Sequence, residues 1–195
     1  GKERLKSMIE TRPDWCVSRQ RVWGVPLPIF VNKKTKDILV DDEVTENIAS
    51  IYEKEGSDCW FSDDTQRFLG KKYKAEDFDK LSDIVEVWFD SGSTHSFVLE
   101  KREDLKWPAS MYLEGSDQHR GWFHSSLLES CGTRDRAPFE TILSHGFVVD
   151  GKGLKMSKSL GNVLAPEDIL KKYGADILRI WVASSNYAED LRIDY

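Results

Sequence analysis

The alternation of apolar and polar positions predicts short helices and a hairpin in the first part of the chain. Residues 2–10 are expected to be helical, and the helix ends before Pro13 because proline disfavours helical backbone in the residue that precedes it. Apolar stretches at 27–31 and 37–40 flank a polar turn, which is typical of a β-hairpin. Apolar residues at helical spacing predict a further helix over 44–54.

The second part of the chain alternates between predicted strands and predicted helices. Runs rich in β-branched and aromatic residues predict strands at 84–89, 110–113 and 141–149, and we expect the first to be a central strand. Helical spacing follows the second strand, and Pro166 with two acidic residues after it begins another helix. Because strands and helices alternate, the fold class is predicted to be α/β, with parallel strands covered by helices.

Polar residues of several kinds follow these predicted strands directly. Ligands of open α/β sheets bind at the carboxyl ends of the strands, so we expect these residues on one rim of the sheet. The residues at this predicted rim are Asp90, Glu114, Asp117, Gln118, His145 and the lysines of the segment 151–159.

The segment 151–159, Gly-Lys-Gly-Leu-Lys-Met-Ser-Lys-Ser, is a basic loop in an acidic chain. Its glycines make it pliable, and Lys152, Lys155 and Lys158 supply mobile positive charges. A cationic loop at the end of a strand can hold a polyphosphate. The alternative is a solvated surface loop, and composition alone does not decide between the two.

The side chains after the second predicted strand suit a nucleotide and a small apolar ligand. Carboxylates such as Glu114 and Asp117 accept hydrogen bonds from ribose hydroxyls, and the amide of Gln118 can orient an ammonium group. Trp88 and Trp122 can wall an apolar pocket. The alternative is structural, because acids before a helix are commonly capping groups and tryptophans commonly lie in the core.

Composition indicates a soluble globular protein, with 39% hydrophobic and 32% charged residues among 195. A formal net charge of -6 argues against non-specific nucleic-acid binding by the chain as a whole. The sequence has no apolar run of membrane-spanning length and no charged-then-apolar leader. Because the apolar runs are short, we expect no membrane partner. Three widely spaced cysteines fit neither a zinc pattern nor a disulfide framework, so we expect a cytoplasmic location.

Several other kinds of site are disfavoured by spacing. His119 and His124 stand five positions apart, which is off the register of a helical pair of metal ligands, and no metal site is expected. The sequence has no G-x-S-x-G elbow of a serine hydrolase. It also has no P-loop and no G-x-G-x-x-G string, which disfavours an ordinary P-loop NTPase or dinucleotide enzyme.

The string 15–24, Trp-Cys-Val-Ser-Arg-Gln-Arg-Val-Trp-Gly, combines aromatic, cationic and amide side chains. Arg19 and Arg21 can bind an anionic partner through charge-assisted hydrogen bonds. The alternative is a transition from surface to core in which the arginine stems cover apolar groups.

Four strings together resemble the bacterial isoleucyl-tRNA synthetase family within the class I aminoacyl-tRNA synthetases. Order and spacing both fit, and the resemblance extends over essentially the whole chain. Trp-Phe-Asp-Ser-Gly-Ser-Thr-His at 88–95 favours the isoleucyl over the valyl or leucyl relatives. The four strings are 15–24, 87–95, 112–123 and 155–162.

This resemblance implies a ligase that activates isoleucine with ATP and transfers it to tRNA(Ile). Magnesium is expected with the ATP, and zinc is not expected in this segment. Lys155 and Lys158 are implied to neutralise the triphosphate while the isoleucine carboxylate attacks its α-phosphorus, which is catalysis by positioning and charge. A pocket of this kind rejects valine only weakly, and the isoleucyl enzyme is itself the standard worked example of that limit.

The resemblance also implies a role for each matching position. Glu114, Gly115, Asp117 and His145 would hold the adenylate, together with the loop residues Met156, Ser157 and Ser159. The isoleucine would be bound by Gln118, Trp88 and Trp122, and Arg19 with Arg21 would contact the tRNA.

The implied organisation is the second half of a Rossmann-like catalytic domain that carries a small α+β insertion. The segments are 1–25, where the chain re-enters after an editing insertion, 26–83, the small connective insertion, 84–164, the nucleotide-binding half with the loop 155–159, and 165–195, the helical start of the stem-contact region.

The sequence lacks the family's first signature, His-Ile-Gly-His, and has no editing domain. We therefore expect a fragment that is inactive alone and needs the missing first half of the catalytic domain in cis. Two alternatives stay open: a freestanding nucleotide- or RNA-binding module derived from a synthetase, and a purely structural domain. A valyl- or leucyl-type relative is a further alternative.

Overall fold

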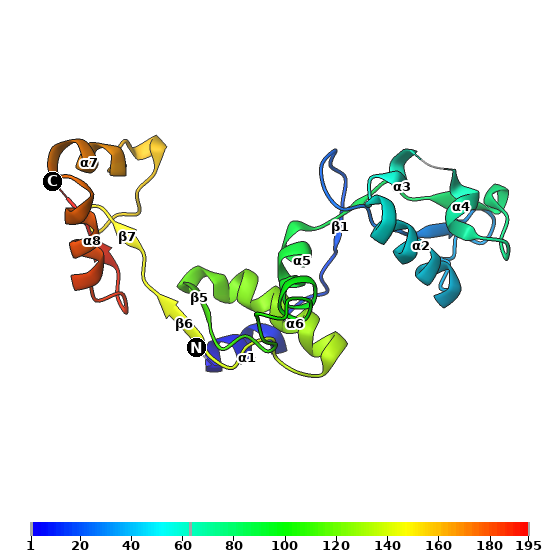
Figure 1. Cartoon of the computed structure of the whole chain (residues 1–195), viewed down its shortest axis with the longest axis horizontal. Coiled ribbons are helices and arrows are strands. Elements are labelled where there is room, and N and C mark those ends of the chain that lie inside the picture. The colour runs from blue at the N-terminus through cyan, green and yellow to red at the C-terminus, as the bar shows by residue number, and fades with distance from the viewer. Residues whose placement is uncertain (1, 63, 195) are drawn as a thin grey trace. The chain divides into compact units, whose positions relative to one another are not determined.

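The computed structural model describes residues 2–62 and 64–194, which form two compact units. The small unit is the segment Pro13–Ser91, and the large unit combines the residues up to Arg12 with those from Gly92 onward. Figure 1 shows the helices and strands of both units. The insertion expected at 26–83 lies within the small unit.

The small unit is built from short strands and helices. One antiparallel pair joins β2 (Phe30–Asn32) to β3 (Phe78–Lys80), and another joins β1 (Ser18–Arg19) to β4 (Ile84–Val85). The helices that begin in this unit are α2 (Asp42–Glu55), α3 (Cys59–Ser62), α4 (Thr65–Leu69), the 3-10 turn η1 (Ala75–Asp77) and α5 (Val87–Gly92).

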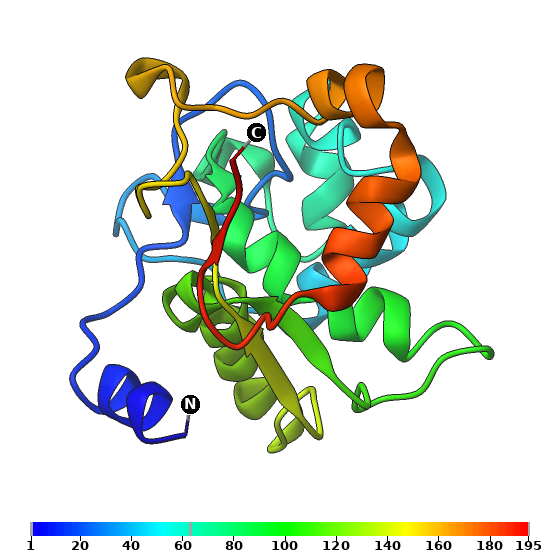
Figure 2. The ribbon, with the colours of Figure 1, turned by 90° about the vertical axis from the view of Figure 1, so that its left-hand side faces the viewer.

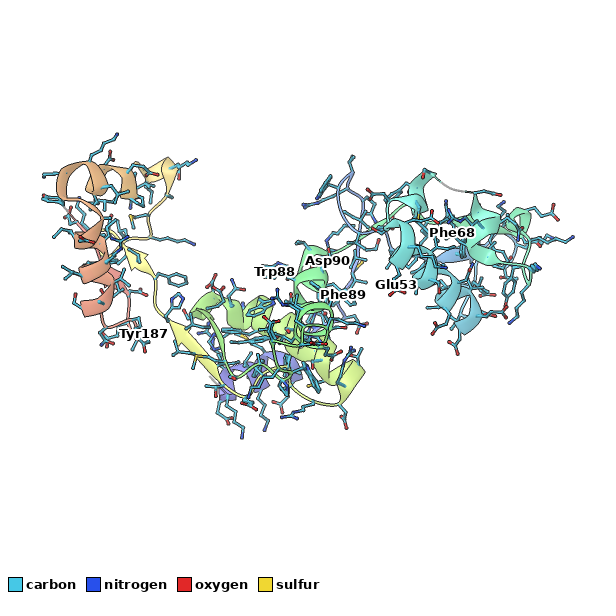
Figure 3. The ribbon with its side chains drawn as sticks, in the orientation of Figure 1. Glu53, Phe68, Trp88, Phe89, Asp90 and Tyr187 are labelled. Carbon is cyan, nitrogen blue, oxygen red and sulfur yellow. The ribbon has the colours of Figure 1, made fainter. Side chains whose placement is uncertain are left out.

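An aromatic cluster forms the core of the small unit. The ring of Trp60 lies 5.1 Å from that of Phe30 and 4.9 Å from that of Phe68, and all three side chains are buried. Figure 3 labels Phe68 within this unit. The indole N–H of Trp60 donates to the carbonyl oxygen of Leu81 at 2.7 Å, so its one polar atom is satisfied.

Helix α2 confirms the helix predicted from apolar spacing, and its ends have clear causes. Asp41 caps the first turn, where its carboxylate accepts from the backbone N–H groups of Glu43 and Val44. The same carboxylate accepts from Lys72 and Tyr73, which ties the cap to a distant loop. These bonds, that from Lys72 first, lower the pKa of Asp41 to about 2.

The predicted hairpin over 27–40 is present only as a short reversal around the turn, where Leu39 N–H donates to Phe30 C=O at 2.9 Å, and it is not the main pairing of its first strand. Strand β2 pairs with β3, and the expected partner contributes only an isolated bridge between Val31 and Ile38. Ile38 and Val40 are 58% and 88% exposed, and Leu39 is the residue of this run that packs against the core, so one side chain holds the second run in place. Phe78 of β3 is buried in the core instead.

The predicted central strand at 84–89 is also wrong beyond its second residue. Only Ile84–Val85 is a strand, its pairing is antiparallel, and α5 follows directly. Glu86 explains the change, because its carboxylate accepts from the backbone N–H of Trp88 at 3.0 Å and so caps the new helix. Trp88, Phe89 and Asp90 therefore project from a helix (Figure 3).

The large unit contains the parallel strands that the α/β pattern predicts. Strand β5 (Tyr112–Gly115) runs parallel to β6 (Ile142–His145), and β7 (Val148–Val149) runs parallel to β8 (Leu191–Arg192). The helices of this unit are α1 (Lys2–Glu10), the π-helical turn η2 (His95–Leu99), η3 (Ser116–Arg120), α6 (Trp122–Arg134), η4 (Lys158–Leu160), α7 (Pro166–Tyr173) and α8 (Ala175–Ser184).

Figure 2 shows α7 and α8, in orange, packed on each other. The helix starts predicted at Lys2 and Pro166 are confirmed. The strand predicted over 141–149 is split into β6 and β7 at Gly146, where an added Cβ would fall on the carbonyl group of Glu189. The backbone of a neighbouring segment therefore interrupts the ladder at this point.

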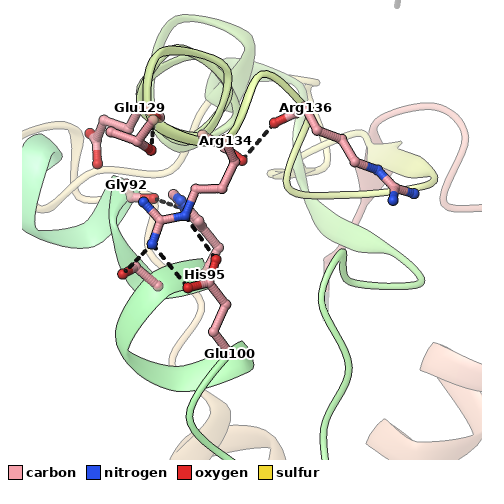
Figure 4. Close-up of polar contacts among 9 residues, drawn as sticks. Gly92, His95, Glu100, Glu129, Arg134 and Arg136 are labelled. Carbon is pink, nitrogen blue, oxygen red and sulfur yellow. Dashed lines mark hydrogen bonds and ion pairs between the residues drawn. The ribbon is translucent and has the colours of Figure 1, made fainter.

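An ion pair fastens η2 to the end of α6 (Figure 4). Arg134 donates from Nε and Nη2 to the two carboxylate oxygens of Glu100, at 2.9 Å each, and from Nη2 to Ser96 Oγ at 3.0 Å. On the same turn His95 is buried, with Nδ1 3.0 Å from the carbonyl oxygen of Gly92. Burial lowers the pKa of His95, which favours the neutral ring of a core residue.

The aromatic core predicts a large effect of Trp60→Ala. The substitution removes a fully buried side chain and leaves a cavity, so we expect the free energy of unfolding to fall by about 3–5 kcal/mol. Urea unfolding of the chain followed by far-UV circular dichroism measures the change. The control is Phe61→Ala on the same helix, which is 47% exposed and should cost about 1 kcal/mol or less. Equal losses in the two variants would contradict the assigned core.

The Asp41 cap predicts a specific dependence of stability on pH. Its pKa is about 2 in the folded chain and ~3.9 in an unfolded one, so its contribution is full above about pH 4 and is lost as the pH falls toward 2. Asp41→Asn keeps a capping oxygen but removes the charge, and we expect the variant to lack this part of the acid destabilisation. Urea unfolding at several pH values, with Asp37→Asn as the control, measures the difference.

Candidate functional site

The parallel pairing of β5 and β6 creates the candidate site at the carboxyl ends of the two strands. The register sets Glu114 beside Ser144 and Gly115 beside His145. Strand β5 runs straight into η3, which carries Asp117. Side chains from two distant segments of sequence therefore meet at one edge, as the α/β pattern predicts.

Gln118 is held in a fixed orientation at this edge. Its Oε1 accepts from the backbone N–H of Trp122 at 2.9 Å, at the beginning of α6. Its Nε2 lies 3.3 Å from Oδ2 of Asp117 and donates to that carboxylate. The amide thus both caps a helix and presents its N–H₂ group to a carboxylate, so the capping and the ligand-binding interpretations are compatible here.

Gly115 has no room for a side chain. A Cβ added there would lie 2.7 Å from Oδ1 of Asp117, 3.5 Å from the ring of Phe147 and 3.7 Å from Cε1 of His145. The Asp117 carboxylate therefore lies directly over the Gly115 backbone. Asp117, just after the end of β5, and His145, at the end of β6, therefore both lie close to Gly115, so one small ligand can contact both.

Trp122 is half-buried against the strand rather than standing free in a pocket. Its ring stacks on that of Tyr112, with centroids 4.1 Å apart and an angle of 13° between the planes. The hydroxyl of Tyr112 is 3.1 Å from Ser126 Oγ, and burial raises the pKa of the tyrosine. Trp88 is 42% exposed and belongs to the small unit.

The basic loop forms a compact hairpin after β7. Lys155 makes an isolated antiparallel bridge with Val149, which folds the loop back on its own strand. The Lys155 Nζ lies 5.9 Å from the centroid of the Phe147 ring, and Lys158 is exposed in η4. Ser157 Oγ caps η4 by accepting from Leu160 N–H at 3.3 Å. Both lysine charges therefore belong to one folded loop.

Three other residues of the loop have defined contacts. Ser157 and Ser159 have their hydroxyl oxygens 3.1 Å apart. Met156 accepts a hydrogen bond at Sδ from the backbone N–H of Leu164 at 3.4 Å, which joins the loop to the segment before α7.

Asp150 and Asn162 organise this loop, and the sequence analysis did not single out either one. Asn162 Nδ2 donates to Oδ2 of Asp150 at 2.9 Å, and Asn162 Oδ1 accepts from Ser157 N–H. The bond from Asn162, followed by that from Leu154 N–H, holds the pKa of Asp150 below its usual range. The available signal was an aspartate directly before a glycine turn, a typical local hydrogen-bond acceptor.

The two arginines expected to contact an anionic partner differ in their surroundings. Arg19 is turned back on its own chain, where Nη1 donates to the carbonyl oxygens of Cys16 and Ser18 at 2.7 and 2.8 Å. Arg21 is exposed. Both line a hollow of about 720 Å³ in the small unit, together with Trp23.

Residues 2–62 and 64–194 include no group of three or more His, Cys, Asp or Glu side chains that could hold a metal ion. Over the same residues, no helix has the length and the apolar character needed to cross a bilayer.

Comparison with known proteins identifies the family to which this chain belongs. Residues 1–194 match the model of the tRNA synthetases class I (I, L, M and V), and the chain belongs to this family. Members of this class use ATP. Among individual proteins, the chain is 89% identical over 195 residues to isoleucine–tRNA ligase of Pelagibacter ubique, and 59% identical over 194 residues to that of Brucella abortus. The expected resemblance to the isoleucyl enzymes is confirmed.

The chain spans about a fifth of the length of these relatives, 22% of the Pelagibacter protein and 20% of the Brucella protein. A crystal structure of a ternary complex of Agrobacterium radiobacter LeuRS with tRNA and LeuAMS is similar at 21% identity and a TM-score of 0.66. That similarity covers 97% of this chain and 28% of the other. At this identity it supports the fold, and the α/β class predicted from the sequence is confirmed.

The crowding at Gly115 predicts that Gly115→Ala weakens ATP binding. The added Cβ displaces the Asp117 carboxylate, and a cost to binding of about 1–3 kcal/mol corresponds to a roughly 5- to 150-fold loss of affinity. Calorimetric titration of the full-length protein with ATP measures it. The matched control is Gly132→Ala on α6, where a Cβ meets no atom within 4 Å and affinity should not change. Equal affinities in the two variants would contradict the crowding argument.

Proposed function

We propose that the chain is part of an isoleucine–tRNA ligase, which forms isoleucyl-adenylate from isoleucine and ATP and transfers isoleucine to tRNA(Ile). The observation that carries the proposal is the register of β5 and β6, which sets Gly115 beside His145 at the rim where Asp117 and Gln118 also lie. The identity with isoleucine–tRNA ligases over the whole chain supports the choice of amino acid.

In this proposal the rim binds the adenylate. Glu114 and Asp117 are exposed carboxylates that accept hydrogen bonds from the ribose hydroxyls of the nucleotide. The absence of a side chain at Gly115 leaves room for the Asp117 carboxylate over its backbone, and His145 borders it on the neighbouring strand.

Isoleucine binds beside Gln118 in this proposal. The ammonium group of the amino acid needs acceptors, which the Asp117 carboxylate and the second lone pair of Gln118 Oε1 provide, and the Gln118–Asp117 hydrogen bond fixes their relative orientation. Trp122 offers an apolar ring face to the aliphatic side chain, with Tyr112 stacked behind it. For Trp88, which lies on α5 of the small unit, the proposed part in isoleucine binding rests on the family resemblance.

The basic loop supplies charge for the chemical step. Lys155 and Lys158 neutralise the triphosphate as the isoleucine carboxylate attacks the α-phosphorus and pyrophosphate leaves. Magnesium enters this proposal as part of the ATP substrate, carried on its phosphates. Ser157, Ser159 and Met156 shape the loop around those oxygens.

The remaining segments take the parts expected from the family organisation. Residues 84–164 form the second half of the nucleotide-binding fold, 26–83 a connective insertion, and 165–195 the start of the stem-contact region. Arg21 is exposed and suits a tRNA phosphate, whereas Arg19 first has to leave its own backbone carbonyl groups.

The function is tested by ATP–pyrophosphate exchange on the full-length protein with isoleucine, valine or leucine as the amino acid. We expect the highest kcat/KM with isoleucine and a lower but measurable kcat/KM with valine, because one missing methylene changes the binding free energy little, a limit for which the isoleucyl enzymes are the well-known case. Exchange driven best by leucine or valine would replace the isoleucyl assignment. No exchange with any of the three would refute the ligase.

The charge role of the loop predicts the effect of Lys158→Ala. We expect the rate of adenylate formation to fall about 100-fold or more, while the KM for isoleucine stays within about twofold, since the lost charge faces phosphate. Exchange kinetics at varied isoleucine and ATP separate the two parameters. The control is Lys171→Ala, which removes an exposed lysine from the last turn of α7. A loss shared equally between kcat and isoleucine binding contradicts the assigned role.

A further inference from the structure

One asparagine connects three separate points of the basic loop. The Nδ2 group of Asn162 donates to Oδ2 of Asp150 at 2.9 Å and to the carbonyl oxygen of Lys155 at 3.3 Å. Its Oδ1 accepts from the backbone N–H of Ser157 at 2.9 Å. A single amide therefore joins the start, the middle and the end of the segment 150–162.

Asp150 and Asn162 together form a hydrogen-bonded brace of this loop, and the Asp150 carboxylate supplies the other half of it. Its Oδ1 accepts from the backbone N–H groups of Lys152 at 3.0 Å and Leu154 at 2.7 Å, which leaves Oδ2 for Asn162. The backbone supports the same turn, because Asp150 N–H donates to Leu154 C=O at 2.9 Å. Both oxygens of this carboxylate are thus used in shaping one loop.

The brace stands on a firm base formed by β7. Ile193 N–H donates to the carbonyl oxygen of Val149 at 3.0 Å, next to the parallel β7–β8 pair. A Cβ added to Gly151 would collide with the carboxylate of Asp194, so the turn lies close against the residues after β8. The start of the loop is therefore anchored to the β7–β8 pair, and its interior is cross-linked by the side chains of Asp150 and Asn162.

We propose that Asp150 and Asn162 are positioning residues, whose mutual hydrogen bond holds the segment 150–162 as one body and so presents Lys155 and Lys158 together to the triphosphate. This inference rests on the proposed function. The physical reason is entropic, because each backbone residue that is not fixed beforehand has to be ordered at the moment of reaction. A misplacement of only 1 Å can cost about 100-fold in rate.

The brace also restricts which part of the loop can move. Gly153 has a φ of +81° and Gly161 a φ of +64°, so both occupy backbone conformations that other residues rarely adopt. The lysines repel one another, and we expect the loop to shift when phosphate binds. With the brace intact, that motion takes place at the ends of the segment rather than between Lys155 and Lys158.

The chemistry of the pair allows a charge-swap test in the full-length synthetase. Asn162→Asp alone sets two carboxylate oxygens against each other at the position of the 2.9 Å bond. Asp150→Asn alone sets two N–H₂ groups against each other, since the oxygen of the new amide must face Lys152 N–H and Leu154 N–H. The double variant restores a donor opposite an acceptor, and its new carboxylate can still accept from Ser157 N–H. It loses the longer bond to the Lys155 carbonyl oxygen, so its recovery is expected to be incomplete.

We expect each single variant to lower the kcat of ATP–pyrophosphate exchange about 10- to 100-fold with little change in the KM for isoleucine. The double variant should recover to within about threefold of the wild type, because the two positions are coupled. Asn186→Ala, which removes an exposed asparagine from the turn before β8, is the control and should retain the full rate. Single variants with full activity, or a double variant as slow as the singles, overturn the proposal.

Hydrogen exchange separates this inference from the proposed function. The backbone N–H groups of Leu154 and Ser157 should exchange faster in both single variants and return to the wild-type rate in the double variant. If the wild-type protein catalyses no ATP–pyrophosphate exchange with isoleucine, the proposed function fails. The hydrogen-exchange rates of these two amides then decide alone whether the brace exists. Unchanged amide rates in the single variants refute it.

Discussion

The structure depends first on the parallel pairing of β5 (Tyr112–Gly115) with β6 (Ile142–His145). Parallel strands end at the same edge, so the backbone ladder brings residues about thirty positions apart in sequence to a single rim. The place of His145 beside Gly115 follows from that register, whereas the tight approach of Asp117 to Gly115 comes from the turn that leads directly from β5 into η3. A slip of one residue would turn the Glu114 side chain to the other face of the sheet and so remove it from the candidate site.

The basic loop shows a different way of fixing a functional segment. A regular ladder is not available to an irregular turn, so polar side chains satisfy the backbone N–H and C=O groups instead. Asp150 and Asn162 do this from the two ends of the segment, and Ser157 does it at the turn η4. The loop therefore combines glycines in unusual backbone conformations with a defined network of hydrogen bonds.

Two wrong expectations have the same physical origin. The apolar run 84–89 has the composition of a strand, but the buried Glu86 caps a helix and ends the strand after Val85. The apolar run 37–40 also resembles a strand, but Ile38 and Val40 are exposed, and the run forms only an isolated bridge with β2. Local propensity is a weak prior in both places, and tertiary burial and capping decide the outcome.

By itself the sequence determined the α/β class, the helices at 2–10, 44–54 and after Pro166, and the set of polar residues that follow the strands. These depend on periodicity, proline and capping, which act over a few residues. Only the tertiary structure decided that β2 pairs with β3, that Trp122 stacks on Tyr112, and that Asn162 reaches back to Asp150. Such contacts join distant positions, and their energy depends on geometry that no local pattern of residues contains.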